Sequence, residues 1–295
     1  MASLSVLGRA AEVPRRRGRF ASGGIYWLFL APASLLLAAF YFYPLLGVLW
    51  ISITEPKPGL GNYALLWSSP AVQHVFATTA RICALTTAIT ILLGYAVAYA
   101  LVHLSPRGQR WMFLGVLLPL WISVLARAFA WVTLLRSEGL INEALLSLGL
   151  IHEPLHLMWN VLGITIGMVH YMLPYAILPL YANMRGIDAR LVAAARGLGA
   201  TRLQAFLRVF LPLSLPGIVG AGILVFIFSL GFFVTPAILG GNRILMIAQY
   251  ISIQILEVLR WGLGAMMATV LMAIVLALIA LLARLVDLRR LFGAG

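Results

Sequence analysis

Six long apolar stretches, separated by shorter polar segments, dominate the pattern of hydrophobic and polar positions along the chain. A helix needs about 20 residues, at roughly 1.5 Å each, to cross the roughly 30 Å hydrocarbon core of a bilayer. The stretches cover residues 26–52, 75–101, 111–135, 161–181, 215–239 and 263–285. Apolar residues surround each stretch on every face, as expected of helices that contact lipid or one another. The pattern therefore predicts an all-α integral membrane protein with six transmembrane helices.

The composition excludes an ordinary soluble domain. Hydrophobic residues make up 63% of the 295 residues, charged residues 10%, and the mean hydropathy is +1.02. Soluble domains are about half apolar and about a quarter charged. Prolines lie inside the apolar stretches, among them Pro32, Pro119, Pro174 and Pro236. Neighbouring helices in a membrane can satisfy the carbonyls that such prolines leave free, so the prolines do not argue against spans.

The charge distribution predicts the topology. The chain has 21 basic and 8 acidic residues, for a net charge of +13. With both termini inside, 15 basic residues fall in inner segments and only four in outer loops. The positive-inside rule therefore places both termini in the cytoplasm, and the basic excess indicates topology rather than nucleic-acid binding. The arginines at 15–17 and 19 precede an apolar run that is too long for a cleaved signal, so we expect an uncleaved first span.

Two rare residues exclude further classes. Cys83 is the single cysteine, which rules out an internal disulfide or a cysteine-based metal site. Lys57, the single lysine, lies between two prolines rather than after a glycine and before Ser or Thr, so the chain has no P-loop. We expect no cofactor on this chain, and any ATP must be used by another polypeptide.

The segment 182–214, between the fourth and fifth spans, is the long inner loop. Asp188 is a suitable N-cap for a short alanine-rich helix that runs through Leu198, and Gly199 can take the positive φ that ends it. Thr201 and Gln204 have the spacing of a capping box, which predicts a second helix from residue 202. Residues 203, 206, 207 and 210 would give this helix one apolar face, and Pro212 and Pro216 would stop it. Such an element suits either a groove on a partner protein or the bilayer surface.

Part of this loop resembles the EAA motif of importer-type ABC permeases. The motif reads Glu-Ala-Ala, three residues, Gly, nine residues, Ile, one residue, Leu-Pro, and residues 193–212 keep every spacing. Ala193 replaces the glutamate and Val209 the isoleucine, so the polar contact of that glutamate is lost. The resemblance implies that separate ATPase subunits dock on this EAA loop. The docking residues that it assigns are Ala193, Ala194, Ala195, Arg196, Gly199, Ala200, Leu211 and Pro212.

Shorter patches are similar to the spermidine/putrescine branch of these permeases. They cover residues 127–131, 139–142, 233–236, 239–241, 246–254 and 261–262. The resemblance implies a permease subunit of a bacterial ABC importer in the inner membrane. Its implied partners are ABC ATPase subunits, a second permease subunit, a periplasmic binding protein and membrane lipid. The second permease is expected to be a related protein, with a homodimer as the alternative. A permease domain would cover residues 25–285, between cytoplasmic segments 1–24 and 286–295.

The spans offer aromatic residues and arginine, but no carboxylate, to a solute. None of the eight acidic residues lies in the middle of a predicted span, which disfavours a proton- or sodium-coupled carrier. Aromatic rings can hold the ammonium groups of a polyamine, the substrate that the resemblance favours. Candidate pathway residues are Trp121, Arg127, Tyr171, Tyr175, Phe228, Phe232 and Phe233. Arg81 and Arg127 could face an anionic solute, but arginines near span ends commonly extend to the interface. The alternatives are an importer of an opine, phosphonate or other organic anion, and a self-sufficient carrier or channel.

Residues 152–156, His-Glu-Pro-Leu-His, have the letters of the zinc-protease signature. That chemistry requires both histidines on one helical turn. Pro154 disfavours helical geometry at Glu153 and lacks an N–H, and no third ligand is evident. We therefore expect no metal site and no catalytic residue here.

Overall fold

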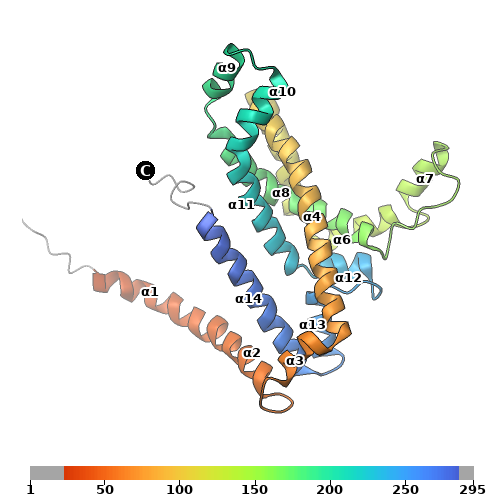
Figure 1. Ribbon diagram of the computed structural model, residues 1–295. Helices are drawn as coiled ribbons and strands as arrows, with labels where there is room; N and C mark the ends of the chain where they lie inside the picture. The colour runs from red at the N-terminus through yellow and green to blue at the C-terminus, as the bar shows by residue number, and fades with distance from the viewer. Residues whose placement is uncertain (1–22, 286–295) are drawn as a thin grey trace, which may run out of the picture. The chain divides into compact units, whose positions relative to one another are not determined.

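The structure is a computed structural model that describes residues 23–285, and every regular element within them is a helix (Figure 1). The elements are α1 (Gly23–Leu37), η1 (Ala38–Phe42), α2 (Tyr43–Thr54), α3 (Gly61–Ser68), α4 (Pro70–His103), α5 (Pro106–Leu117), η2 (Leu118–Trp121), α6 (Val124–Leu135), α7 (Leu140–Ser147), α8 (Val161–Arg185), α9 (Ala189–Gly197), α10 (Arg202–Ala205), η3 (Phe206–Phe210), α11 (Leu211–Leu230), α12 (Val234–Gly240), α13 (Ile247–Leu256) and α14 (Trp261–Leu285). The chain divides into two units, residues 1–47 and 48–295. The predicted cytoplasmic segments 1–24 and 286–295 lie outside the described residues, apart from positions 23 and 24.

Five helices in the described part of the chain are long and apolar enough to cross a membrane. They are Phe29–Thr54, Pro70–His103, Val161–Arg185, Arg202–Leu230 and Trp261–Arg284. The predicted third span is not a single straight helix, because Pro106–Trp121 and Val124–Ser147 meet at 101°. Pro119 lies in the 3-10 turn η2, and Ile122 is extended, so the helix ends there and restarts at Val124. A proline has no N–H to continue an α-helical ladder, which explains why the break falls at this site.

The predicted fifth span, 215–239, also needs correction. Its helix runs without a stop from Arg202 to Leu230, and α12 follows as a separate short helix. Pro236 falls in the first turn of α12, where a missing N–H costs nothing. At the other end, the prediction that Pro212 and Pro216 stop the loop helix is wrong, because both prolines lie within α11. The π turn η3, in which the N–H of Leu211 donates to the carbonyl of Phe206, precedes Pro212 and carries the helix through it.

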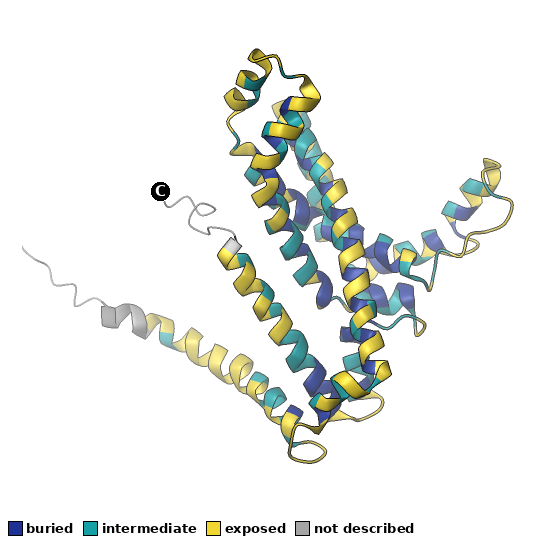
Figure 2. Ribbon diagram, in the orientation of Figure 1, coloured by how far each residue is buried: buried dark blue, intermediate teal, exposed yellow. Residues whose placement is uncertain are grey.

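The core of the second unit forms where α8 packs between α4 and α11. Figure 2 shows α8 as mostly buried, whereas α14 exposes much of its length. Buried side chains from the three helices meet in one cluster that includes Ala98, Leu101, Met172, Ala176, Leu180 and Val225. A methyl group on Gly217 would lie 2.7 Å from the Asn183 side chain, so only glycine lets α11 approach α8 so closely. The exposed apolar faces are the surfaces available to lipid and to other subunits.

A buried asparagine fixes the link between α6 and α8. Asn142 in α7 is fully buried; its Nδ2 donates to the carbonyls of Arg136 and Leu155, each at 3.0 Å. The N–H of Leu155 donates back to its Oδ1 at 2.8 Å. One side chain therefore ties together both ends of a loop that has little regular structure.

We expect Asn142→Ala to lower the thermal unfolding midpoint of the purified protein clearly. The substitution strands a buried N–H and two carbonyls, a loss of about 3 kcal/mol. Thermal unfolding in detergent measures the effect. Ser147→Ala, which removes one exposed hydroxyl bond on the same helix, is the matched control and should change little. An Asn142→Ala midpoint equal to that of the control would contradict the anchoring role.

Candidate functional site

The loop between α8 and α11 forms a helix–turn–helix whose local signals the sequence predicted. Asp188 caps α9 by accepting the N–H of Arg190 at 2.8 Å. Gly199 has φ +91°, and the N–H of Ala200 donates to the carbonyl of Ala195 at 3.1 Å. The capping box of Thr201 is also present. The N-cap, the terminal glycine and the capping box are thus confirmed as structural features.

The predicted docking residues lie together on this loop with different exposure. Ala193, Ala194, Arg196, Gly199 and Pro212 are exposed, whereas Ala195, Ala200 and Leu211 are half-buried. The sequence argument missed Leu198, which is 91% exposed in the turn. The signal for it was present in the sequence, because a leucine between two glycines has no helix face against which to pack.

The apolar face predicted for the second helix divides in two. Phe206 and Phe210 turn inward, with ring centroids 5.5 and 5.3 Å from that of Tyr99 in α4. Leu203 and Leu207 remain exposed. The stripe divides because α4 packs against only one of its edges. The outer edge, with Leu198, gives the loop an apolar surface that nothing in the described chain covers.

Five of the predicted pathway residues converge where α6, α8 and the break between α11 and α12 meet. The Cζ atom of Arg127 lies 4.3 Å from the ring centroid of Tyr171. The Tyr171 centroid is in turn 4.6 Å from that of Phe232 and 5.8 Å from that of Tyr175. Phe228 joins through Tyr175, at 5.2 Å. We call these five residues the aromatic cluster.

Two predicted pathway residues do not join the aromatic cluster. Trp121, in η2, is 90% exposed, and Phe233 is exposed beside the break. Neither forms an aromatic pair within the described residues. The 101° bend before α6 and the end of α11 at Leu230 decide this outcome, because both redirect the chain at these positions.

Arg127 does not extend to the interface, contrary to the snorkelling expected of an arginine near a span end. It is 8% exposed, and its Nε and Nη1 atoms have no hydrogen-bond partner within the described chain. One turn further along α6, Trp131 donates to Nδ1 of His170 at 3.1 Å and fixes α6 against α8. Burying a guanidinium without a carboxylate partner costs free energy. The site around Arg127 is therefore a place where a group from another subunit or a solute can supply the missing hydrogen-bond acceptor. Arg81, by contrast, is exposed.

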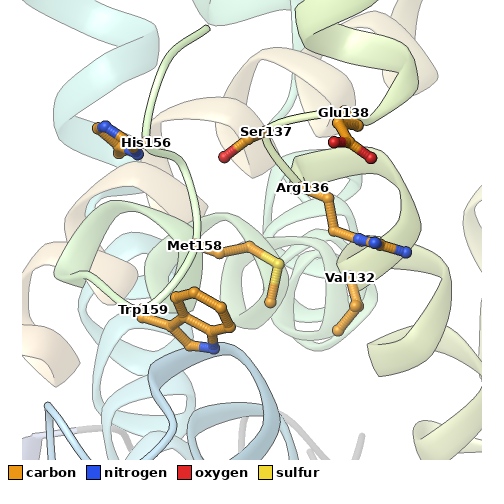
Figure 3. A pocket seen from close by; sticks show the side chains of 7 residues that line it. All are labelled: Val132, Arg136, Ser137, Glu138, His156, Met158 and Trp159. Carbon is orange, nitrogen blue, oxygen red and sulfur yellow. The ribbon is translucent and has the colours of Figure 1, made fainter.

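A cavity of about 310 Å³ lies beside the links that join α6, α7 and α8 (Figure 3). Arg136, Ser137 and Glu138 come from the first link, and His156 and Trp159 from the second. This cavity brings one carboxylate, one guanidinium and an indole ring together. Sequence reasoning did not find it, although the polar run 136–138 directly after an apolar helix was visible.

The zinc-protease letters have no zinc-protease geometry. Residues 151–160 are irregular, so His152 and His156 do not share a helical turn. Within residues 23–285 no group of three His, Cys, Asp or Glu side chains is placed to hold a metal ion.

Comparison with known proteins places the chain among membrane transport components. The family described as "Binding-protein-dependent transport system inner membrane component" matches residues 90–291. The spermidine/putrescine transport system permease protein PotB of Salmonella typhimurium strain LT2 is 33% identical over 206 residues, 70% of this chain and 71% of the relative. PotB of Escherichia coli K12 is 32% identical, covering 70% and 74%. YdcU, an inner membrane ABC transporter permease protein of the same strain, is 30% identical over 74% and 75% of the two chains.

Solved structures agree on the fold. A chain from a bacterial ABC transporter involved in the import of the acidic polysaccharide alginate aligns with a TM-score of 0.69 at 20% identity, covering 88% of this chain and 96% of that one. The alginate transporter in complex with an alginate pentasaccharide-bound periplasmic protein gives 0.71 at 18% identity, covering 88% and 93%. At these identities the likeness concerns the fold alone.

Proposed function

This chain belongs to the family of binding-protein-dependent transport system inner membrane components, and on that premise we propose that its importer takes up a polyamine. It is a membrane-spanning permease subunit of an ABC importer, a multi-pass protein of the inner membrane. The proposal that the substrate is a polyamine rests on the identity of 32–33% with permeases named for spermidine and putrescine, over 70% of the chain. An importer for an opine, a phosphonate or another anion is not favoured by these relatives.

The aromatic cluster supports a cationic solute. Tyrosine and phenylalanine rings attract ammonium groups over their faces, by about 0.5 kcal/mol when exposed and about 2 kcal/mol when desolvated. Tyr175, Phe228 and Phe232 supply such rings next to the break between α11 and α12. The cavity with Glu138 and Trp159 adds the carboxylate that the spans themselves lack. A polyamine would therefore meet a carboxylate and an indole in this cavity and rings in the cluster.

In this proposal other chains supply the ATP hydrolysis that drives transport and complete the importer. The importer has two ATPase subunits, and one of them docks on the α8–α11 loop of this chain through Ala193, Ala194, Gly199 and the exposed Leu198. The basic residues of that loop support a cytoplasmic location for it, with both termini on the same side. A periplasmic binding protein delivers the solute, and a second, related permease completes the pathway. The chain itself has no ATPase site, because its single lysine lacks a P-loop context.

Uptake by the reconstituted importer tests the substrate assignment. We expect proteoliposomes with the two permeases, the ATPases and the binding protein to accumulate labelled spermidine or putrescine only when ATP is supplied to the ATPase side. Vesicles that contain this chain alone are the matched control and should accumulate neither. Flux through the chain alone would indicate a self-sufficient carrier. Uptake of a labelled phosphonate or opine, with no uptake of the two amines, would contradict the polyamine assignment.

A further inference from the structure

A second cavity, of about 290 Å³, lies where the α8–α11 loop meets the ends of the core helices. One face of each contributing helix lines it. Ala189, Val192 and Arg196 of α9 follow the spacing i, i+3, i+7, and Arg202 and Phe206 follow i, i+4 across α10 and η3. Residues at these spacings share one face of a helix. The tight turn between the two helices thus directs one arginine from each side of it toward the same space.

The cavity is lined by positive charge without a carboxylate. Arg196 and Arg202 are among the lining residues, and none of the lining residues is Asp or Glu. The planar guanidinium groups of the two arginines match the oxygens of a phosphate in geometry. Nδ1 of His103 donates to the carbonyl of Tyr99 at 2.8 Å, which holds this ring against its own helix α4. The chemistry of this lining suits an anion.

Apolar and aromatic side chains form the rest of the wall. The rings of Tyr99 and His103 lie 4.3 Å apart, and Tyr99 also contacts Phe210 edge to face. Val102 and Met184 continue the wall at the ends of α4 and α8. Those two helices are membrane spans by length and composition, and the cavity lies at their ends. A ligand with a charged head and an apolar body fits both parts of this lining.

We propose that this cavity binds the phosphodiester headgroup of an anionic membrane phospholipid, held by Arg196 and Arg202 with the glycerol region against the aromatic wall. Basic pockets between spans at the cytoplasmic surface bind such headgroups. The inference rests on the proposed function only in placing the α8–α11 loop at the cytoplasmic membrane surface. Its consequence is that the lipid supports the turn at Gly199 from the membrane side, so lipid charge affects the loop that couples to the ATPase.

A carboxylate of the ATPase is a poorer occupant for this space. On α9, Ala193 and Ala194 are exposed and do not line the cavity, and Leu198 projects from the turn. Among the residues assigned to ATPase docking, only Arg196 lines the cavity, and the others present a surface apart from it. The cavity is closed on one side by α4. The lipid reaches the cavity from the bilayer without displacing that surface.

Lipid retention by the purified complex tests the proposal. The full importer is exchanged into vesicles of phosphatidylcholine mixed with phosphatidylglycerol, and the bound phosphatidylglycerol is quantified by mass spectrometry. We expect Arg202→Gln to lower this retention about fivefold. The matched control is Arg208→Gln, an exposed arginine of the same loop that does not line the cavity, and it should retain as much as the unmodified chain.

Three outcomes would overturn the proposal. The first is equal retention by Arg202→Gln and Arg208→Gln. The second is full displacement of phosphatidylglycerol by inorganic phosphate, which would make the site one for free phosphate. The third is loss of ATPase co-purification in Arg202→Gln with unchanged lipid retention, which would identify an ATPase carboxylate as the occupant. Because the readout needs neither substrate nor ATP, a failure of polyamine uptake leaves it unaffected, and the two proposals fail separately.

Discussion

Gly199→Val is expected to reduce ATP-driven import strongly while the protein still inserts into the membrane. Gly199 has φ +91°, in the left-handed region that a β-branched residue avoids. No heavy atom lies within 4 Å of an added Cβ, so the effect comes from the backbone and from the surface shape, not from packing. Strain of about 1–3 kcal/mol would distort the turn that presents Leu198 and Ala200. We expect uptake to fall about tenfold or more, together with ATPase co-purification.

Two variants separate the causes of this loss. Gly197→Val adds the same side chain two residues away, also with no atom within 4 Å, but at a helical position. Gly199→Asn adds a side chain that tolerates positive φ. We expect both to keep more import than Gly199→Val. Normal uptake by Gly199→Val, or an equal loss in Gly197→Val, would show that the conformation of this turn is not what coupling requires.

Arg127→Met is expected to change which amine the importer prefers. Arg127 carries a fixed positive charge into the aromatic cluster, and its Nε and Nη1 atoms are buried without a partner in the described chain. A solute ammonium passing about 8 Å from it is opposed by about 2 kcal/mol at an effective dielectric constant of about 20. The opposition grows with each charge on the solute. Removing the guanidinium should therefore raise the uptake of spermidine relative to putrescine, because spermidine carries more charge.

The ratio of the two uptake rates, measured in the same proteoliposomes, checks this prediction. Methionine keeps an unbranched apolar chain of similar reach, and replacing a poorly compensated buried charge by an apolar side chain is often neutral for folding. Arg81→Met removes an exposed arginine of α4 and should leave the ratio unchanged. An unchanged ratio in Arg127→Met would remove Arg127 from the solute pathway, and loss of assembly would assign its guanidinium to another subunit.

Local signals in the sequence specified the elements of the α8–α11 loop. Asp188, Gly199 and the capping box of Thr201 act through backbone groups within a few residues, so they do not depend on the rest of the fold. The same holds for the long apolar runs, because hydrocarbon requires about 20 helical residues whatever lies beside them. The inside location of the loop and of both termini stays a prediction from charge.

The pattern of hydrophobicity did not predict the breaks within the predicted spans. Apolar residues continue through Ile122 and Phe232 without a change in hydropathy, so a hydropathy pattern passes over both. Pro119 and Pro236 marked the positions, but prolines are also tolerated inside spans, as Pro174 is in α8. Which proline ends a helix depends on whether neighbouring helices satisfy the freed carbonyl.

The sequence by itself thus determined the class of the protein, five of its spans and the helical caps of the α8–α11 loop, and it named all five residues of the aromatic cluster as candidates. Only the tertiary structure decided that Arg127 is buried beneath Tyr171, that Trp121 and Phe233 stay outside the cluster, and that Phe206 and Phe210 turn inward while Leu203 and Leu207 do not. The reason is physical. Caps and spans depend on a residue and its near neighbours or on the solvent, whereas burial depends on which helix packs against which face.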